Sequence, residues 1–66
     1  MNNGYRDPSH VAAEIIGMLV TKYGLTEKEA MLSFLRSHTF KRMMEDHCLA
    51  QLPSEEILSM YEQEAS

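Results

Sequence analysis

The sequence predicts an all-α fold, a small bundle of three to four short helices in a single domain of 66 residues. Apolar residues recur at intervals of three and four, the spacing of an amphipathic helix, and the longest apolar run is only three residues. Signals that end one helix and begin another follow closely at Gly24 and Thr26. Two amphipathic helices are therefore expected to meet at this corner.

The first helix is predicted over residues 8–23. Asp7 can cap its start, and Pro8 suits the first turn, where a missing N–H costs nothing. The apolar residues of this segment occupy an arc broader than one neighbouring helix can cover. We therefore expect this helix to be central, covered by two helices of its own chain or by one of them and another subunit. Residues 1–6 are polar and are expected to be disordered.

The second helix is predicted over residues 26–36. Gly24 can adopt the left-handed conformation that closes the first helix, and Thr26 and Glu29 have the spacing of a capping box. Arg36-Ser37-His38-Thr39 then interrupts the helical pattern with residues that favour caps and turns. A third helix over 39–47 is expected, although one kinked helix from Thr26 to His47 is the alternative.

The fourth helix is predicted over residues 54–64. Pro53 disfavours helix at the residue before it, and Ser54 offers a cap ahead of two glutamates that suit the positive end of a helix dipole. The second and third helices together also resemble a helix-turn-helix in their order.

Composition limits the functional classes. The net charge is −4: residues 1–42 hold all six Lys and Arg with four acids, and the rest hold six acids. A membrane span is excluded by the short apolar runs, and no secretory signal is expected at the N-terminus. One cysteine permits no internal disulfide and suits a reducing compartment, so we expect a cytoplasmic protein.

A chain of this size buries little core, and small domains usually need a further stabilising device. We therefore expect a homo-oligomer or a complex with a partner protein, in which a non-enzymatic module mediates protein–protein interaction. Methionine is abundant, and its flexible thioether adapts to irregular packing. The residues expected to form the core or an interaction surface are Ile15, Ile16, Leu19, Phe40, Met43 and Met44.

DNA binding is the alternative function. A basic cluster runs from Arg36 to Arg42, and a reading helix would present Arg36, Thr39, Lys41 and Arg42 to a major groove. Affinity for DNA comes mainly from neutralised phosphates, whereas this chain is acidic and places Glu45 and Asp46 after these residues. Nucleic acid is therefore the less favoured partner.

Catalysis and metal binding have little support in the sequence. His47 and Cys48 are adjacent, and adjacent helical residues point about 100° apart, so they do not converge on one ion or share a proton. A third ligand at useful spacing is missing, and we expect Cys48 to pack as a small apolar group. We expect no enzymatic activity, no cofactor and no metal ion.

A resemblance adds to this interpretation. The run from Leu25 to Phe40, with T-E-x-E-A followed by F-x-x-S-x-T-F, and the run from Leu52 to Glu64 resemble a family of short bacterial helical proteins of unknown function. Members of that family are often encoded near toxin-like genes, which implies an accessory or neutralising role. The family's turn usually holds an aspartate and often a glycine, where this chain has Glu45-Asp46-His47-Cys48. The resemblance implies no functional residue.

Overall fold

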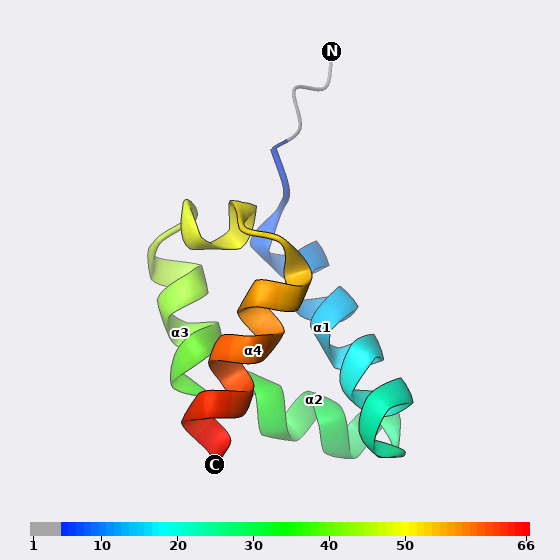
Figure 1. Cartoon of the computed structure of the whole chain (residues 1–66). Helices are drawn as coiled ribbons and strands as arrows, with labels where there is room; N and C mark the ends of the chain where they lie inside the picture. The colour runs from blue at the N-terminus through cyan, green and yellow to red at the C-terminus, as the bar shows by residue number, and fades with distance from the viewer. Residues whose placement is uncertain (1–4) are drawn as a thin grey trace.

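The computed structural model describes residues 5–66, and these form an all-α bundle, as predicted. Figure 1 shows α4 packed across the front of the bundle, between α3 and α1, with α2 running along the base. A single 3₁₀ turn, η1, connects α3 to α4. The elements are α1 (Pro8–Tyr23), α2 (Glu27–Leu35), α3 (His38–Glu45), η1 (Leu49–Gln51) and α4 (Ser54–Ala65).

The ends of α1 follow the predicted capping residues. The Asp7 side chain accepts a hydrogen bond from the backbone N–H of Ser9 at 2.9 Å, and Pro8 occupies the first turn. Gly24 closes the helix in the left-handed conformation at φ 68°, and its N–H donates to the carbonyl of Val20. The predicted bounds of α1 are therefore confirmed.

The corner between α2 and α3 resolves the alternative left open by the sequence. Thr26 and Glu29 form the predicted reciprocal capping box at the start of α2. At Ser37 the backbone is extended, with φ −78° and ψ 155°, and its hydroxyl accepts from the N–H of Phe40 at 3.1 Å. Ser37 thus starts a separate helix, and a continuous kinked helix is wrong.

The segment before α1 is attached to the η1–α4 connection. The Arg6 N–H donates to the side chain of Gln51 at 2.9 Å, and the Arg6 guanidinium donates to the carbonyl of Leu52 at 2.8 Å. Arg6 also donates to the Ser54 hydroxyl, which in turn donates to Glu14, so Ser54 forms no cap and this prediction was wrong. Disorder was expected over residues 1–6: residues 1–4 lie outside the described part, whereas Arg6 is held in place.

The core draws on all four helices and on η1. Phe34 lies at its centre, fully buried, with the rings of Phe40 and Tyr61 in edge-to-face contact at centroid distances of 5.7 and 5.6 Å. These contacts join α2 to α3 and to α4. The buried apolar residues are Val11, Ala12, Ile15, Ile16, Leu19, Ala30, Phe34, Met43, Ala50, Ile57 and Leu58.

The chain itself covers the broad apolar arc of α1. This helix contacts α2, α4 and α3, and Ile15, Ile16 and Leu19 retain 9% or less of their accessible surface. The arc thus has the two or more covering helices of its own chain that the sequence allowed for. At the edges of the arc Met18 and Val20 are partly buried, and Tyr23 is 52% exposed.

Phe34→Ala should remove the contact that joins three helices. A buried Phe→Ala replacement costs about 3–5 kcal/mol, comparable to the whole stability of a domain this small. We expect the cooperative urea unfolding transition, followed by far-UV circular dichroism, to be largely lost. Leu32→Ala, at a position 50% exposed on the same helix, should stay within about 0.5 kcal/mol of wild type. Equal losses in both variants would contradict this role of Phe34.

The two helical-region glycines should respond to alanine in opposite directions. Gly24→Ala forces a Cβ into the left-handed conformation and should lower the free energy of unfolding by about 1 kcal/mol. At Gly17, within α1, an added Cβ meets no atom within 4 Å, so alanine should raise it by about 0.5–1 kcal/mol. Thermal melts of the two variants give the test, and shifts of the same sign would refute it.

Candidate functional site

Exposed apolar side chains gather on α2 and α3. Met31 is 41% exposed, Leu32 50%, Leu35 42% and Met44 42%, while Phe40 is half-buried beside the core. The three α2 residues follow the i, i+1, i+4 pattern of one helix face, and Phe40 and Met44 are four residues apart on α3. We call these five residues the α2–α3 face.

A groove of about 420 Å³ lies where the two helices meet at this face. Leu35, Phe40 and Met44 supply its apolar lining. Arg36 and Lys41 add two cations to the lining, and Glu45 adds one carboxylate. The lining therefore combines three apolar side chains with two cations and one carboxylate, and His38 also lines the groove.

The six residues expected to form the core or an interaction surface separate into two groups. Ile15, Ile16, Leu19 and Met43 are core residues, so for these four the core alternative is confirmed and the interaction-surface alternative was wrong. Phe40 and Met44 are the two that reach the groove. Sequence reasoning missed Met31, Leu32 and Leu35, because Met31 and Leu35 share an i, i+4 spacing that resembles a buried stripe. The true buried stripe of α2 is Ala30 and Phe34.

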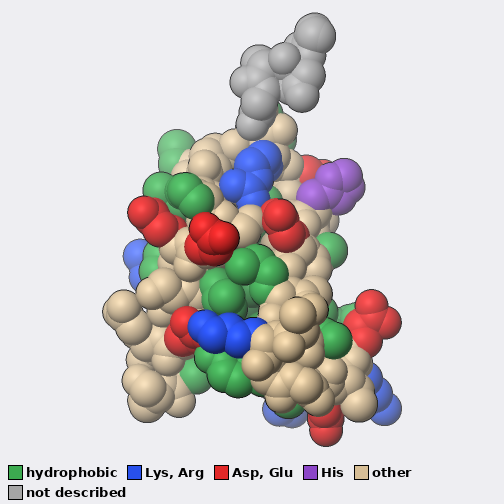
Figure 2. Space-filling view, turned by 45° about the vertical axis from the view of Figure 1, so that its right-hand side comes forward, with side chains coloured by type: hydrophobic (Ala, Val, Ile, Leu, Met, Phe, Trp, Pro, Cys, Tyr) green, Lys and Arg blue, Asp and Glu red, His purple; other side chains and the backbone are tan. Residues whose placement is uncertain are grey.

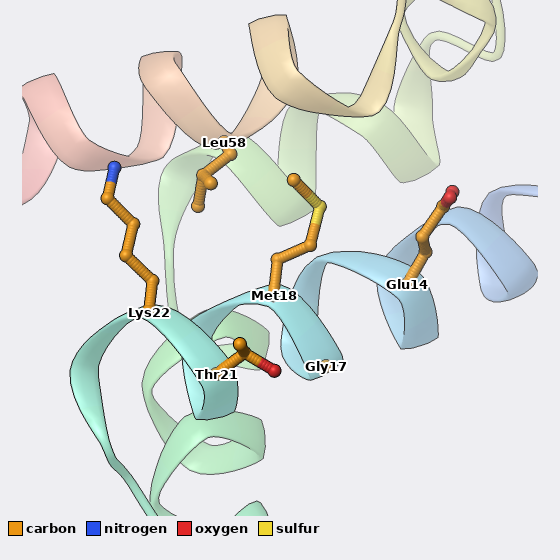
Figure 3. A pocket seen from close by; sticks show the side chains of 6 residues that line it. All are labelled: Glu14, Gly17, Met18, Thr21, Lys22 and Leu58. Carbon is orange, nitrogen blue, oxygen red and sulfur yellow. The ribbon is translucent and has the colours of Figure 1, made fainter.

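A second groove lies between α1 and α4. In Figure 3 the side chains of Met18 and Leu58 lie between the two helices, with Glu14 and Lys22 further along α1 on either side. Figure 2 shows hydrophobic side chains gathered in the middle of one face, between acidic side chains above and a basic one below. The charged side chains of this groove bind other residues of the same chain. Glu14 accepts hydrogen bonds from Arg6 and Ser54, and Lys22 donates a hydrogen bond to Glu62.

The start of α3 does not have the form that a DNA-reading helix requires. Thr39 is only 3% exposed, and the Glu64 carboxylate accepts from the backbone N–H groups of His38 and Thr39 at 2.7 and 2.9 Å and from the Thr39 hydroxyl at 2.8 Å. In a helix-turn-helix these first residues contact base edges. Here a carboxylate from α4 occupies that position, so Thr39 as a DNA contact was wrong.

The basic cluster is also divided between two sides of α3. Lys41 lines the groove with Leu35 and Met44, whereas Arg42 lines a different hollow with Met60 and Glu64. Only Arg36 and Ser37 separate α2 from α3, fewer than the three or four residues of the usual helix-turn-helix turn. Arg36, Lys41 and Arg42 are all exposed, with Arg36 and Lys41 lining one hollow and Arg42 another.

His47 and Cys48 lie in the turn after α3 and not within a helix. Cys48 is exposed, so the expectation that it packs as an apolar group was wrong. The Tyr5 hydroxyl and His47 Nδ1 are 3.2 Å apart, within hydrogen-bond distance. Over residues 5–66, no group of three or more His, Cys, Asp or Glu side chains is arranged to hold a metal ion, and no helix is long and apolar enough to cross a membrane.

Glu64 makes the stability of the bundle sensitive to acid. The hydrogen bond from the His38 N–H lowers the pKa of Glu64 below its ordinary value of 4.5, and the Thr39 donors act in the same direction. A carboxyl with a lowered pKa stabilises the folded state above its unfolded pKa, and this contribution is lost as the pH falls through the lowered value. Wild type should therefore lose stability as the pH falls below about 4.5.

Glu64→Gln should weaken this pH dependence, because the amide carries no charge at any pH and keeps only one of the two accepting oxygens. At neutral pH the variant should melt below wild type, and the difference should shrink in acid. Glu45→Gln, at an exposed position at the end of α3, should keep the wild-type pH profile. Melting temperatures measured between neutral and acid pH test this, and parallel profiles for wild type and Glu64→Gln would contradict it.

Comparison with known proteins yields no match for this chain among protein families, curated proteins or solved structures. The resemblance to short bacterial helical proteins therefore stays a prediction. The α2–α3 face is identified from the structure of this chain alone.

Proposed function

We propose that the protein is a non-enzymatic interaction module that binds a partner protein through the α2–α3 face. The observation that supports this proposal is the exposure of four large apolar side chains, Met31, Leu32, Leu35 and Met44, on two adjacent helices. Of these, Leu35 and Met44 line one groove with Phe40, and an exposed apolar patch of this kind is typical of a protein–protein contact. The core residues of α1, by contrast, are buried within the chain: Ile15, Ile16 and Leu19 keep 9% or less of their accessible surface.

The chemistry of the face suits a partner contact. Burying apolar surface contributes about 25 cal/mol per Å². These side chains stay about two-fifths exposed after folding, so a partner that covers them gains this free energy on binding. Met31 and Met44 can adjust their rotamers to a partner's shape. Arg36 and Lys41, which line the groove, can fix the orientation of the bound chain by pairing with its charges.

An accessory role in a bacterial cytoplasm is part of the same proposal. Two things support it: the resemblance to short bacterial helical proteins, and the exposed thiol of Cys48, which suits a reducing compartment. Association between copies of the chain stays a prediction alongside binding of a different partner.

Photo-crosslinking in cells of the native host tests the proposal. A photoreactive phenylalanine analogue replaces Leu35 in one variant and Ser59, exposed on α4, in a matched control. The Leu35 position should give an adduct of defined mass that the Ser59 position does not give. Excess unlabelled wild-type chain should compete with its formation, whereas Met44→Glu, which places a charge in the groove, should compete at least tenfold less well.

An adduct at twice the chain mass would identify association between copies through this face. The same adducts from both positions, or none from Leu35, would refute the proposed function. Circular dichroism of Met44→Glu provides the folding control, since Met44 is exposed and its replacement should leave the helical signal unchanged.

A further inference from the structure

We infer that the partner presents an acidic amphipathic helix to the α2–α3 face. This inference rests on the proposed function and specifies the chemistry of the bound segment. Three observations support it: the spacing of the apolar side chains of the face, the sign of the charge in its groove, and the lack of a matching free helix among the described residues.

The apolar groups have the arrangement of a helix-binding groove. Leu35 on α2 and Phe40 and Met44 on α3 line one hollow at the junction of the two helices. Met31 lies one turn before Leu35 and extends the apolar surface along α2. A helix laid into such a groove inserts side chains at i, i+3 or i+4, and i+7. α2 is nine residues long and α3 is eight. At 1.5 Å per residue each spans about 13 Å, so a bound helix of about three turns is long enough to cover the face.

The charge around these groups selects an acidic partner. Lys28 lies on the same stripe of α2 as Met31 and Leu35, while Arg36 and Lys41 line the groove itself. Glu45 is the one carboxylate in the lining. The groove lining thus holds two cations and one carboxylate, and Glu27, four residues before Met31, lies beside Lys28 at the start of α2, although the chain as a whole carries a net charge of −4. Carboxylates flanking the anchors of a bound helix would meet complementary charge, which favours encounter and fixes orientation.

Residues 5–66, which the structure describes, do not offer such a helix. Its acidic helix is α4, which carries Glu55 and Glu56, but the apolar side chains Ile57 and Leu58 of α4 are buried in the core. Pairing two copies through identical α2–α3 faces would instead bring like charges from Lys28, Arg36 and Lys41 near one another. These two facts favour a different chain over a second copy as the bound partner.

Selection from a displayed library of random 14-residue peptides, with the folded protein as bait and Met44→Glu for counter-selection, tests the chemistry. The enriched peptides should be net acidic and should carry apolar residues at i, i+3 or i+4, and i+7. A synthetic copy of an enriched peptide should gain helical circular dichroism on binding. Its affinity, from fluorescence anisotropy, should fall at least tenfold in Met44→Glu and severalfold in Lys41→Glu.

Arg42→Glu is the matched control for charge, because it reverses the same charge on the same helix, about 100° around α3, where Arg42 lines a different hollow. It should leave peptide affinity within twofold of wild type. Equal losses in Lys41→Glu and Arg42→Glu would show a general electrostatic effect and would contradict docking in the groove.

Three further results would overturn the inference. Enriched peptides that are basic, extended or absent would exclude an acidic helix. Binding of duplex DNA that weakens steeply with salt and falls in both Lys41→Glu and Arg42→Glu would assign the face to nucleic acid. Crosslinked dimers as the only adduct from position 35 would assign it to a second copy. In the first case the adduct from position 35 would persist, so failure of this inference is distinguishable from failure of the proposed function.

Discussion

The structure depends on the covering of one helix by the other three. The apolar arc of α1 is wider than any single helical neighbour, and α2, α3 and α4 close over it together. Phe34 makes this arrangement possible, because its ring contacts both Phe40 and Tyr61 and so joins the three covering helices to one another. A chain of 66 residues thereby completes a core without a disulfide.

Polar contacts at the ends of the helices hold the covering helices in register. Near the C-terminus of α4, Glu62 accepts from Lys22 and Tyr23 at the end of α1, while Glu64 accepts from the start of α3. At the opposite end, Arg6 joins the chain before α1 to the start of α4. Exposed ion pairs contribute little individually to the free energy of folding. These contacts matter because each joins the end of one helix to another part of the chain. The acidic side chains of α4 thus accept hydrogen bonds from Lys22 and Tyr23 at the end of α1 and from backbone N–H groups at the start of α3.

The sequence was sufficient for the helices because their limits are local. Gly24, Thr26 and Glu29 act within a few residues of themselves, and the structure places them as their types predict. Tertiary partners could not be predicted in the same way. Ser54 has the form of a cap, yet Arg6 and Glu14, some 40 or more residues away along the chain, engage its hydroxyl. From its position in the sequence Thr39 was expected to be exposed and to contact DNA, whereas in the structure it is buried and donates a hydrogen bond to Glu64 of α4.

The candidate site follows the same division. Its apolar residues could be recognised as helical from their spacing, but spacing does not tell which of two adjacent stripes on α2 turns inward. Ala30 and Phe34 take the core, and Met31 and Leu35 are left outside. What folding leaves uncovered is therefore a corner whose groove is lined by apolar side chains, two cations and one carboxylate, and the proposed binding of a partner rests on this surface.

Hydrogen exchange of the α1 amides at two protein concentrations about 100-fold apart tests most directly whether one chain closes its own core. The account predicts that the amides of Ile15–Leu19 are among the slowest to exchange and that their rates are the same at both concentrations. Rates that rise on dilution would mean that a second molecule shelters α1, and would contradict the closed single-chain core on which the assignment of the α2–α3 face depends.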